Sequence, residues 1–109
     1  MRELLEGLIS KFNAKVASDP ALREEIGDLT KTVLIELKDG TKWHFTLKDR
    51  RVERLEDGGA AGADITIITD AETLRALILR EMGPFKAYAL GKVKLKGSLD
   101  DLARFRKFF

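Results

Sequence analysis

The sequence predicts an α+β fold in which five strands form one sheet and helices precede, interrupt and follow them. In several short segments apolar residues alternate with polar ones, which is typical of half-buried strands. In the others apolar residues recur every three or four positions, which is typical of amphipathic helices. A length of 109 residues is enough for one core without metals or disulfides. We therefore expect residues 1–109 to form a single domain.

Two helices are predicted before the first strand. The second begins at Asp19-Pro20, because aspartate is a preferred N-cap and proline fits the first helical position, and it ends at Gly27. The first carries a broad apolar face, which we expect to lie against the core. Its members are Leu4, Leu5, Leu8, Ile9, Phe12 and Val16.

A hairpin of two strands, residues 32–37 and 42–47, is predicted next. A two-residue turn would pair apolar with polar residues across the strands. A three-residue loop over 38–40, with Gly40 at a left-handed bulge position, keeps the faces separate. The resulting pairs are Ile35 with Trp43, Val33 with Phe45, and Glu36 with Lys42.

A third strand is predicted over residues 51–55, and its many charges favour an edge position. The glycine-rich residues 58–62 predict a flexible connection, because a phosphate loop would lead into a helix and this run leads into a strand. The fourth strand follows, where Ile65 and Ile67 alternate with polar neighbours.

A helix over residues 70–82 follows this strand. Thr69 and Glu72 have the spacing of a capping box at its start, and Gly83-Pro84 breaks it. The apolar face of this helix comprises Leu74, Leu77, Ile78 and Met82.

The last elements are a short helix, a strand and a final helix. Phe85 and Tyr88 give the short helix an apolar stripe, and Val93 and Leu95 alternate with lysines in the strand. Ser98 is spaced to cap the final helix. That helix bears Leu99, Leu102, Phe105 and Phe109.

The central stretch resembles the sterol carrier protein 2 (SCP2-type) lipid-binding domain family. The matching motifs occur in the order strand, helix, proline, glycine and strand, and the likeness extends over nearly the whole chain. One departure is Arg80-Glu81-Met82, which stands where family members usually carry a Gly-Lys pair. The motifs are Ala63-Asp64-Ile65-Thr66-Ile67, Pro84-Phe85-Lys86-Ala87-Tyr88 and Gly91-Lys92-Val93-Lys94-Leu95-Lys96-Gly97.

The resemblance implies a mixed, mostly antiparallel sheet with helices packed on one face and a hydrophobic tunnel between the two layers. It also implies non-catalytic binding, and transfer, of a fatty acid, acyl-CoA or sterol-like lipid. Affinity for such a ligand should follow chain length more than headgroup, because each buried methylene contributes roughly 0.8 kcal/mol. The expected lipid-binding residues are Trp43, Phe45, Ile67, Leu74, Leu77, Ile78, Met82, Phe85, Tyr88, Leu102, Phe105 and Phe109.

Lys92, Lys94 and Lys96 line one face of the predicted last strand. The simpler interpretation is that these lysines protect an edge strand from pairing with other chains. The alternative is a weak contact with a membrane surface, because lysines attract anionic headgroups.

Composition excludes several classes of function. The net charge of +2 and the mixture of acids and bases argue against a nucleic-acid binder. There is no cysteine, and His44 is the only histidine, so we expect neither a metal site nor a cofactor. We predict no enzymatic activity, because His44 has no partner in the sequence pattern for proton transfer.

The remaining expectations concern setting and partners. The start lacks the apolar stretch of a signal peptide and the end is not a peroxisomal address, so we expect a cytoplasmic protein. Many Glu, Lys and Arg residues with no Gln suggest a heat-adapted source. A monomer or a homodimer is expected. The alternative function is an interaction or dimerisation module whose C-terminal phenylalanines bury against a partner.

Overall fold

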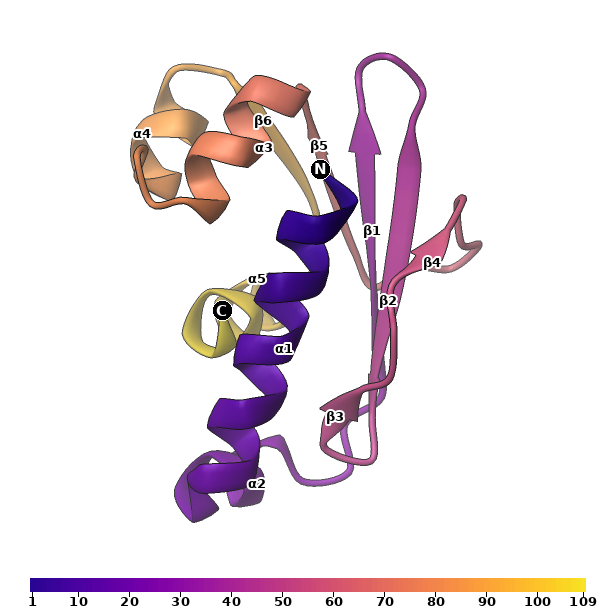
Figure 1. The fold of residues 1–109 in the computed structure, drawn as a ribbon, viewed down its shortest axis with the longest axis vertical. Coiled ribbons are helices and arrows are strands. Elements are labelled where there is room, and N and C mark those ends of the chain that lie inside the picture. The colour runs from indigo at the N-terminus through magenta and orange to yellow at the C-terminus, as the bar shows by residue number, and fades with distance from the viewer.

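A computed structural model describes residues 1–109 as two layers, a sheet and a set of helices that all lie on one side of it (Figure 1). No helix in the chain is both long enough and apolar enough to cross a membrane. The helices are α1 (Arg2–Ser18), α2 (Pro20–Ile26), α3 (Ala71–Ile78), α4 (Pro84–Ala89) and α5 (Leu99–Phe108). The strands are β1 (Lys31–Leu37), β2 (Lys42–Lys48), β3 (Arg51–Val52), β4 (Glu56–Asp57), β5 (Ile65–Thr69) and β6 (Val93–Gly97).

The sheet has the strand order β3-β2-β1-β5-β6, with the short strand β4 pairing beside β3 along β2. The pairing of β1 with β5 is parallel, and all other pairs are antiparallel. This arrangement confirms the mixed, mostly antiparallel sheet and the helices on one face. It places β6, with its lysines, at an edge.

The predicted hairpin register is confirmed. Ile35 pairs with Trp43, and Val33 pairs with Phe45. Gly40 adopts a φ of +95°, the left-handed conformation that the three-residue loop requires. Because side chains alternate along a strand, this register sends the large apolar residues of both strands to the helix-covered face.

The predicted third strand is shorter in the structure than in the sequence analysis. Only Arg51 and Val52 pair with β2, and the chain then forms β4, which was not predicted. The reason is Asn13 of α1, whose side chain takes over the free edge of Val52. The Val52 amide donates to Asn13 Oδ1 (2.8 Å), and Asn13 Nδ2 donates to the Val52 carbonyl (2.7 Å). A helix side chain therefore replaces a further strand.

The prediction of a capping box at Thr69 is wrong, because Asp70 is the N-cap of α3. Its carboxylate accepts from the Thr73 amide (2.7 Å), and this bond lowers the pKa of Asp70. Thr69 is the fully buried end of β5, and its hydroxyl donates to the Lys92 carbonyl (2.8 Å). A strand that continues through Thr69 leaves the capping role to the next residue.

The predicted extension of this helix to Met82 is also wrong. The helix ends at Ile78, and Arg80 adopts a left-handed φ of +59°. A left-handed residue reverses the chain after a helix. Met82 therefore lies in the turn that leads to α4.

We predict that Asp70→Ala lowers the free energy of unfolding by about 1 kcal/mol, because it removes an N-cap hydrogen bond. Urea denaturation followed by circular dichroism measures the change. Glu72→Ala is the matched control, since it would break a capping box but leaves the observed cap intact. A larger loss for Glu72→Ala than for Asp70→Ala would contradict the assignment.

Candidate functional site

A small, partly open cavity lies between the sheet and α5. Its volume is about 30 Å³, which holds one or two water molecules and no hydrocarbon chain. The tunnel expected from the resemblance is therefore not open in this structure. The cavity walls come from the start of β1, from β2 and β5, and from α5. They are Leu29, Lys31, Val33, Phe45, Leu47, Ile65, Asp101, Arg104, Phe105, Phe108 and Phe109.

The C-terminal phenylalanines fill the space between the layers. The Phe109 ring stacks on Phe12 of α1 at a centroid separation of 4.5 Å and on Phe105 at 4.9 Å. It also lies 5.8 Å from the Phe45 ring of β2. Phe108 is 6% exposed and belongs to the same core. Aromatic pairs at these separations stabilise the fold by more than the burial of their surface alone. We call the three rings of Phe105, Phe108 and Phe109 the plug, because they fill the space between the layers.

The start of α5 is tied closely to the sheet. A Cβ on Gly97, which has a φ of +151°, would lie 2.8 Å from the Asp64 carbonyl oxygen, so the backbones are in contact there. The Asp64 side chain in turn accepts from the Thr32 amide (2.8 Å). Ser98 caps the helix by accepting from the Asp101 amide (3.1 Å), as predicted. These contacts fix the start of α5 against the sheet.

A buried ion pair also fastens the first half of α5. Asp101 Oδ1 lies 3.0 Å from Lys31 Nζ and 3.1 Å from Arg104 Nη1. Burial alone would raise the pKa of Asp101, but the hydrogen bond and charge of Lys31, with Ser98 and Arg104, hold it below its ordinary value. At the other end, Lys107 pairs with Glu25 of α2 at the surface. Exposed ion pairs of this kind contribute little to the stability of a fold.

The structure places the twelve predicted lipid-binding residues in three environments. Trp43, Phe45, Ile67 and Leu74 are buried in the core. Six others are half-buried and pack against it, namely Leu77, Ile78, Met82, Leu102, Phe105 and Phe109. Phe85 and Tyr88 are 65% and 61% exposed. Of the twelve, only Phe45, Phe105 and Phe109 line the cavity.

The structure adds residues that sequence reasoning missed. Phe108 lines the cavity although it stands outside the predicted face of the final helix. Its spacing of three residues from Phe105 was a usable signal. Phe12 was assigned only to a helix face, and nothing in the sequence shows that it meets Phe109. Lys31 and Asp101 form their pair across 70 residues, which no local pattern reveals.

A separate depression near β3 and β4 has a volume of about 410 Å³. It is lined only by polar residues, with three cations and three anions among them, so it does not suit a hydrocarbon. The lining residues are Thr46, Lys48, Asp49, Arg51, Glu53, Arg54 and Glu56.

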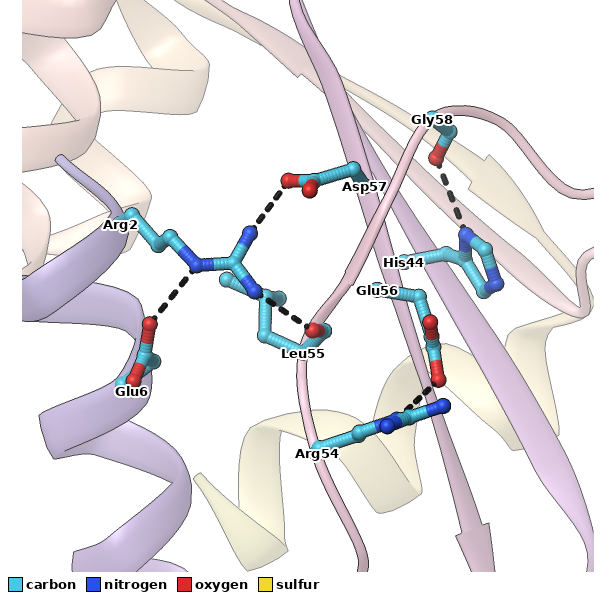
Figure 2. Close-up of polar contacts among 8 residues, drawn as sticks. All are labelled: Arg2, Glu6, His44, Arg54, Leu55, Glu56, Asp57 and Gly58. Carbon is cyan, nitrogen blue, oxygen red and sulfur yellow. Dashed lines mark hydrogen bonds and ion pairs between the residues drawn. The ribbon is translucent and has the colours of Figure 1, made fainter.

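His44 lies on the sheet face opposite the helices, among contacts that hold β4 in place (Figure 2). Its Nδ1 donates to the Gly58 carbonyl oxygen (3.0 Å), while the nearby Glu56 carboxylate pairs with Arg54 instead (2.6 Å). No group of three His, Cys, Asp or Glu side chains is placed to hold a metal ion. The surroundings of His44 give it the role of fixing a loop.

The same view shows how α1 holds the other side of this segment. Arg2 bridges Glu6 of its own helix (2.9 Å) and the Leu55 carbonyl (3.0 Å), and it pairs with Asp57 of β4. Leu55 is thereby kept in the core, where it is 3% exposed. The segment from β3 to β4 is thus bonded to α1 on one side and to β2 on the other.

The sequence profile of the SCP-2 sterol transfer family matches residues 9–109. The chain belongs to this family. The resemblance stated from the motifs is thus confirmed. Among curated protein sequences, none matches the chain.

Solved structures share the SCP2-family fold. UbiJ-SCP2, a ubiquinone synthesis protein, is 24% identical with a TM-score of 0.65, over 94% of this chain and 89% of its own. Palmitated SCP2L2 from Aedes aegypti is 20% identical with a TM-score of 0.63, over 94% of this chain and 90% of its own. The sec-alkylsulfatase Pisa1 from Pseudomonas sp. is 22% identical with a TM-score of 0.61, over 73% of this chain. The SCP2-family chain spans only 13% of that enzyme's length.

We predict that the attachment of α5 weakens in acid. A carboxyl whose pKa is depressed in the folded state stabilises that state above its unfolded value of about 3.8, and the contribution is lost as the pH falls through the depressed pKa. Asp101→Asn should therefore destabilise the protein at pH 7 and should lose most of this difference from the wild type below about pH 3.

Urea denaturation from pH 7 to pH 2.5 measures this difference. Asp100→Asn is the matched control, because Asp100 is exposed on the same helical turn. The ion pair has no such role if both variants show the same pH dependence.

Proposed function

We propose that the chain binds the hydrocarbon tail of a lipid in the space that Phe105, Phe108 and Phe109 occupy. The observation that supports this is the nature of the plug. It consists of three aromatic rings at the end of α5, it packs on the rings of Phe12 and Phe45, and it lies between the sheet and α1. Family members are lipid carriers, and a hydrocarbon tail can replace aromatic rings without leaving buried polar groups unpaired.

The free-energy cost of displacing the rings and the gain from burying a lipid tail together set a minimum length for the tail. Exposing a buried phenylalanine costs roughly 1.5–3 kcal/mol. Because two of the three rings are already partly exposed, displacing all three costs about 5 kcal/mol. An eight-carbon tail gains about 6 kcal/mol and barely offsets this cost, whereas a sixteen-carbon tail gains about 12 kcal/mol. Long tails should therefore bind and short tails should not.

The charged groups at the cavity favour an acidic ligand. Lys31 and Arg104 face the single carboxylate of Asp101, so this end of the cavity carries an excess positive charge. Arg104 is 43% exposed at its side chain and can turn toward a bound headgroup. A fatty-acid carboxylate fits this end better than a sterol hydroxyl, because a guanidinium binds carboxylates in a two-pronged geometry.

The alternative function, a module that buries its C-terminal phenylalanines against a partner, draws no support from their positions. Phe108 is almost fully buried, and Phe109 is stacked on Phe12 and Phe105 within the same chain. These rings would have to leave the core before they could meet a partner.

We predict that Phe109→Ala binds palmitate more tightly than the wild type, by about tenfold or more. Removing the ring creates an apolar cavity, and such cavities bind apolar ligands. Displacement of a fluorescent fatty acid measures the affinity, and circular dichroism verifies the fold. Octanoate should not compete, since each pair of methylenes is worth more than a factor of ten. Equal affinity for Phe109→Ala and the wild type would count against the plug.

We predict that Val33→Phe abolishes palmitate binding, because Val33 lines the cavity from β1 and added volume there closes the space. Leu34→Phe is the matched control, since the neighbouring residue adds the same ring to the opposite face of the strand. Loss of binding in both variants, or in neither, would place the ligand elsewhere.

A further inference from the structure

The large apolar side chains that the fold leaves exposed are confined to one part of the chain. All six lie between residues 79 and 99, in the segment that contains the end of α3, α4, β6 and the start of α5. None lies in the first 78 residues, which include the longest helix and the hairpin. Single exposed apolar residues are ordinary, but a set restricted to one segment indicates an interaction site. They are Leu79, Phe85, Tyr88, Leu90, Leu95 and Leu99.

Helix α4 concentrates this exposure. It lies at the margin of the molecule, beyond α3 and away from the sheet (Figure 1). Its only buried residue is Ala87, so the aromatic rings of Phe85 and Tyr88 are on its outer side. The two residues are three positions apart, which places them side by side on the helix. A helix of six residues thus directs its two largest side chains to solvent.

Positive charge coincides with this apolar segment. Residues 71–109 contain nine Lys and Arg against four Asp and Glu, a net charge of +5. Residues 1–70 contain eleven Lys and Arg against fourteen Asp and Glu, a net charge of −3. Near α4, Lys86 and Lys92 are exposed, and the Arg106 guanidinium lies 4.3 Å from the centre of the Phe85 ring. The small overall charge of the chain hides a strong separation of charge.

We propose that this region docks on the surface of an anionic lipid bilayer. The docking surface consists of Leu79, Phe85, Lys86, Tyr88, Leu90 and Lys92. Aromatic and leucine side chains enter the boundary between headgroups and acyl chains, and the lysines bind the headgroup phosphates. Tyrosine suits this boundary because its ring is apolar and its hydroxyl is polar.

The composition favours a bilayer over a protein partner. Lysine is depleted in the centre of protein–protein interfaces, whereas here Lys86 and Lys92 alternate with the exposed apolar side chains. Protection of an edge strand accounts for the lysines of β6 alone. It does not account for Phe85, Tyr88 and Leu90, which lie outside any strand.

The docking surface meets the plug at one contact. Arg106, over Phe85, belongs to α5, so α4 and the end of α5 touch there. Lipid phosphates compete for this guanidinium once Phe85 enters the bilayer, which would loosen the end of α5 where a tail must enter. Docking on a bilayer needs no lipid tail inside the protein, so vesicle binding can be tested independently of the proposed function.

Sedimentation with vesicles tests the docking surface. We expect the wild type to bind vesicles of phosphatidylglycerol and phosphatidylcholine at low salt, and to bind pure phosphatidylcholine far more weakly. Lys86→Gln/Lys92→Gln should lose about 25-fold in affinity, since each basic residue near the surface is worth about a factor of five. Lys11→Gln/Lys15→Gln on α1 removes the same charge from the other part of the chain and should bind like the wild type.

A fluorescence measurement tests insertion. In a Trp43→Phe background, Phe85→Trp should shift its emission to the blue on adding anionic vesicles, because the indole enters an apolar environment. Circular dichroism verifies that each variant is folded. Equal binding to neutral and anionic vesicles, equal losses for the two lysine pairs, or an unshifted tryptophan would overturn the proposal. So would capture of a protein by this surface without vesicle binding.

Discussion

The stacking of Phe109 on Phe12 is the contact that closes the space between the two layers. Helix α1 covers the hairpin side of the sheet, and α5 reaches the same core from the end of the chain. The Phe109 ring joins them, because it touches α1, the sheet residue Phe45 and its own helix at once.

Packing explains why the two layers of this SCP2-family chain enclose only a small cavity. An open apolar tunnel in water would forfeit the packing contacts of its walls. Here the chain fills the space with its own rings, and only about 30 Å³ stays empty. The start of α5 is fixed at Gly97 and by the Lys31–Asp101 pair, so the proposed entry of a lipid tail requires only the far end of the helix to move. The exposed aromatic residues of α4 lie next to that far end.

Alternation of apolar residues and one glycine were sufficient to predict the hairpin and its register, because shifting either strand by one residue would put Trp43 and Phe45 in water. The mixed character of the sheet was predicted only through the family resemblance, since no local pattern identifies a parallel neighbour, and the strand order was not predicted. Long-range partners account for the errors. Asn13 replaced a strand at Val52, and Asp70 became the N-cap because Thr69 was committed to β5. The apolar stripe of Phe85 and Tyr88 was taken for a lining, although a six-residue helix with one buried alanine exposes it. Of the predicted lipid-binding residues, only Phe45, Phe105 and Phe109 line the cavity, because the periodicity of a helix or strand shows which residues point inward but not where a cavity lies between the layers.

The most direct test of the plug is an NMR measurement on the complete chain with ¹³C-labelled palmitate. If the tail takes the place of the rings, its methylene protons should show Overhauser contacts with Val33, Phe45 and Ile65, and the contacts between Phe12 and Phe109 should disappear. Retention of the Phe12–Phe109 contacts while palmitate is bound would contradict the account, because the ligand would then occupy a different part of the molecule.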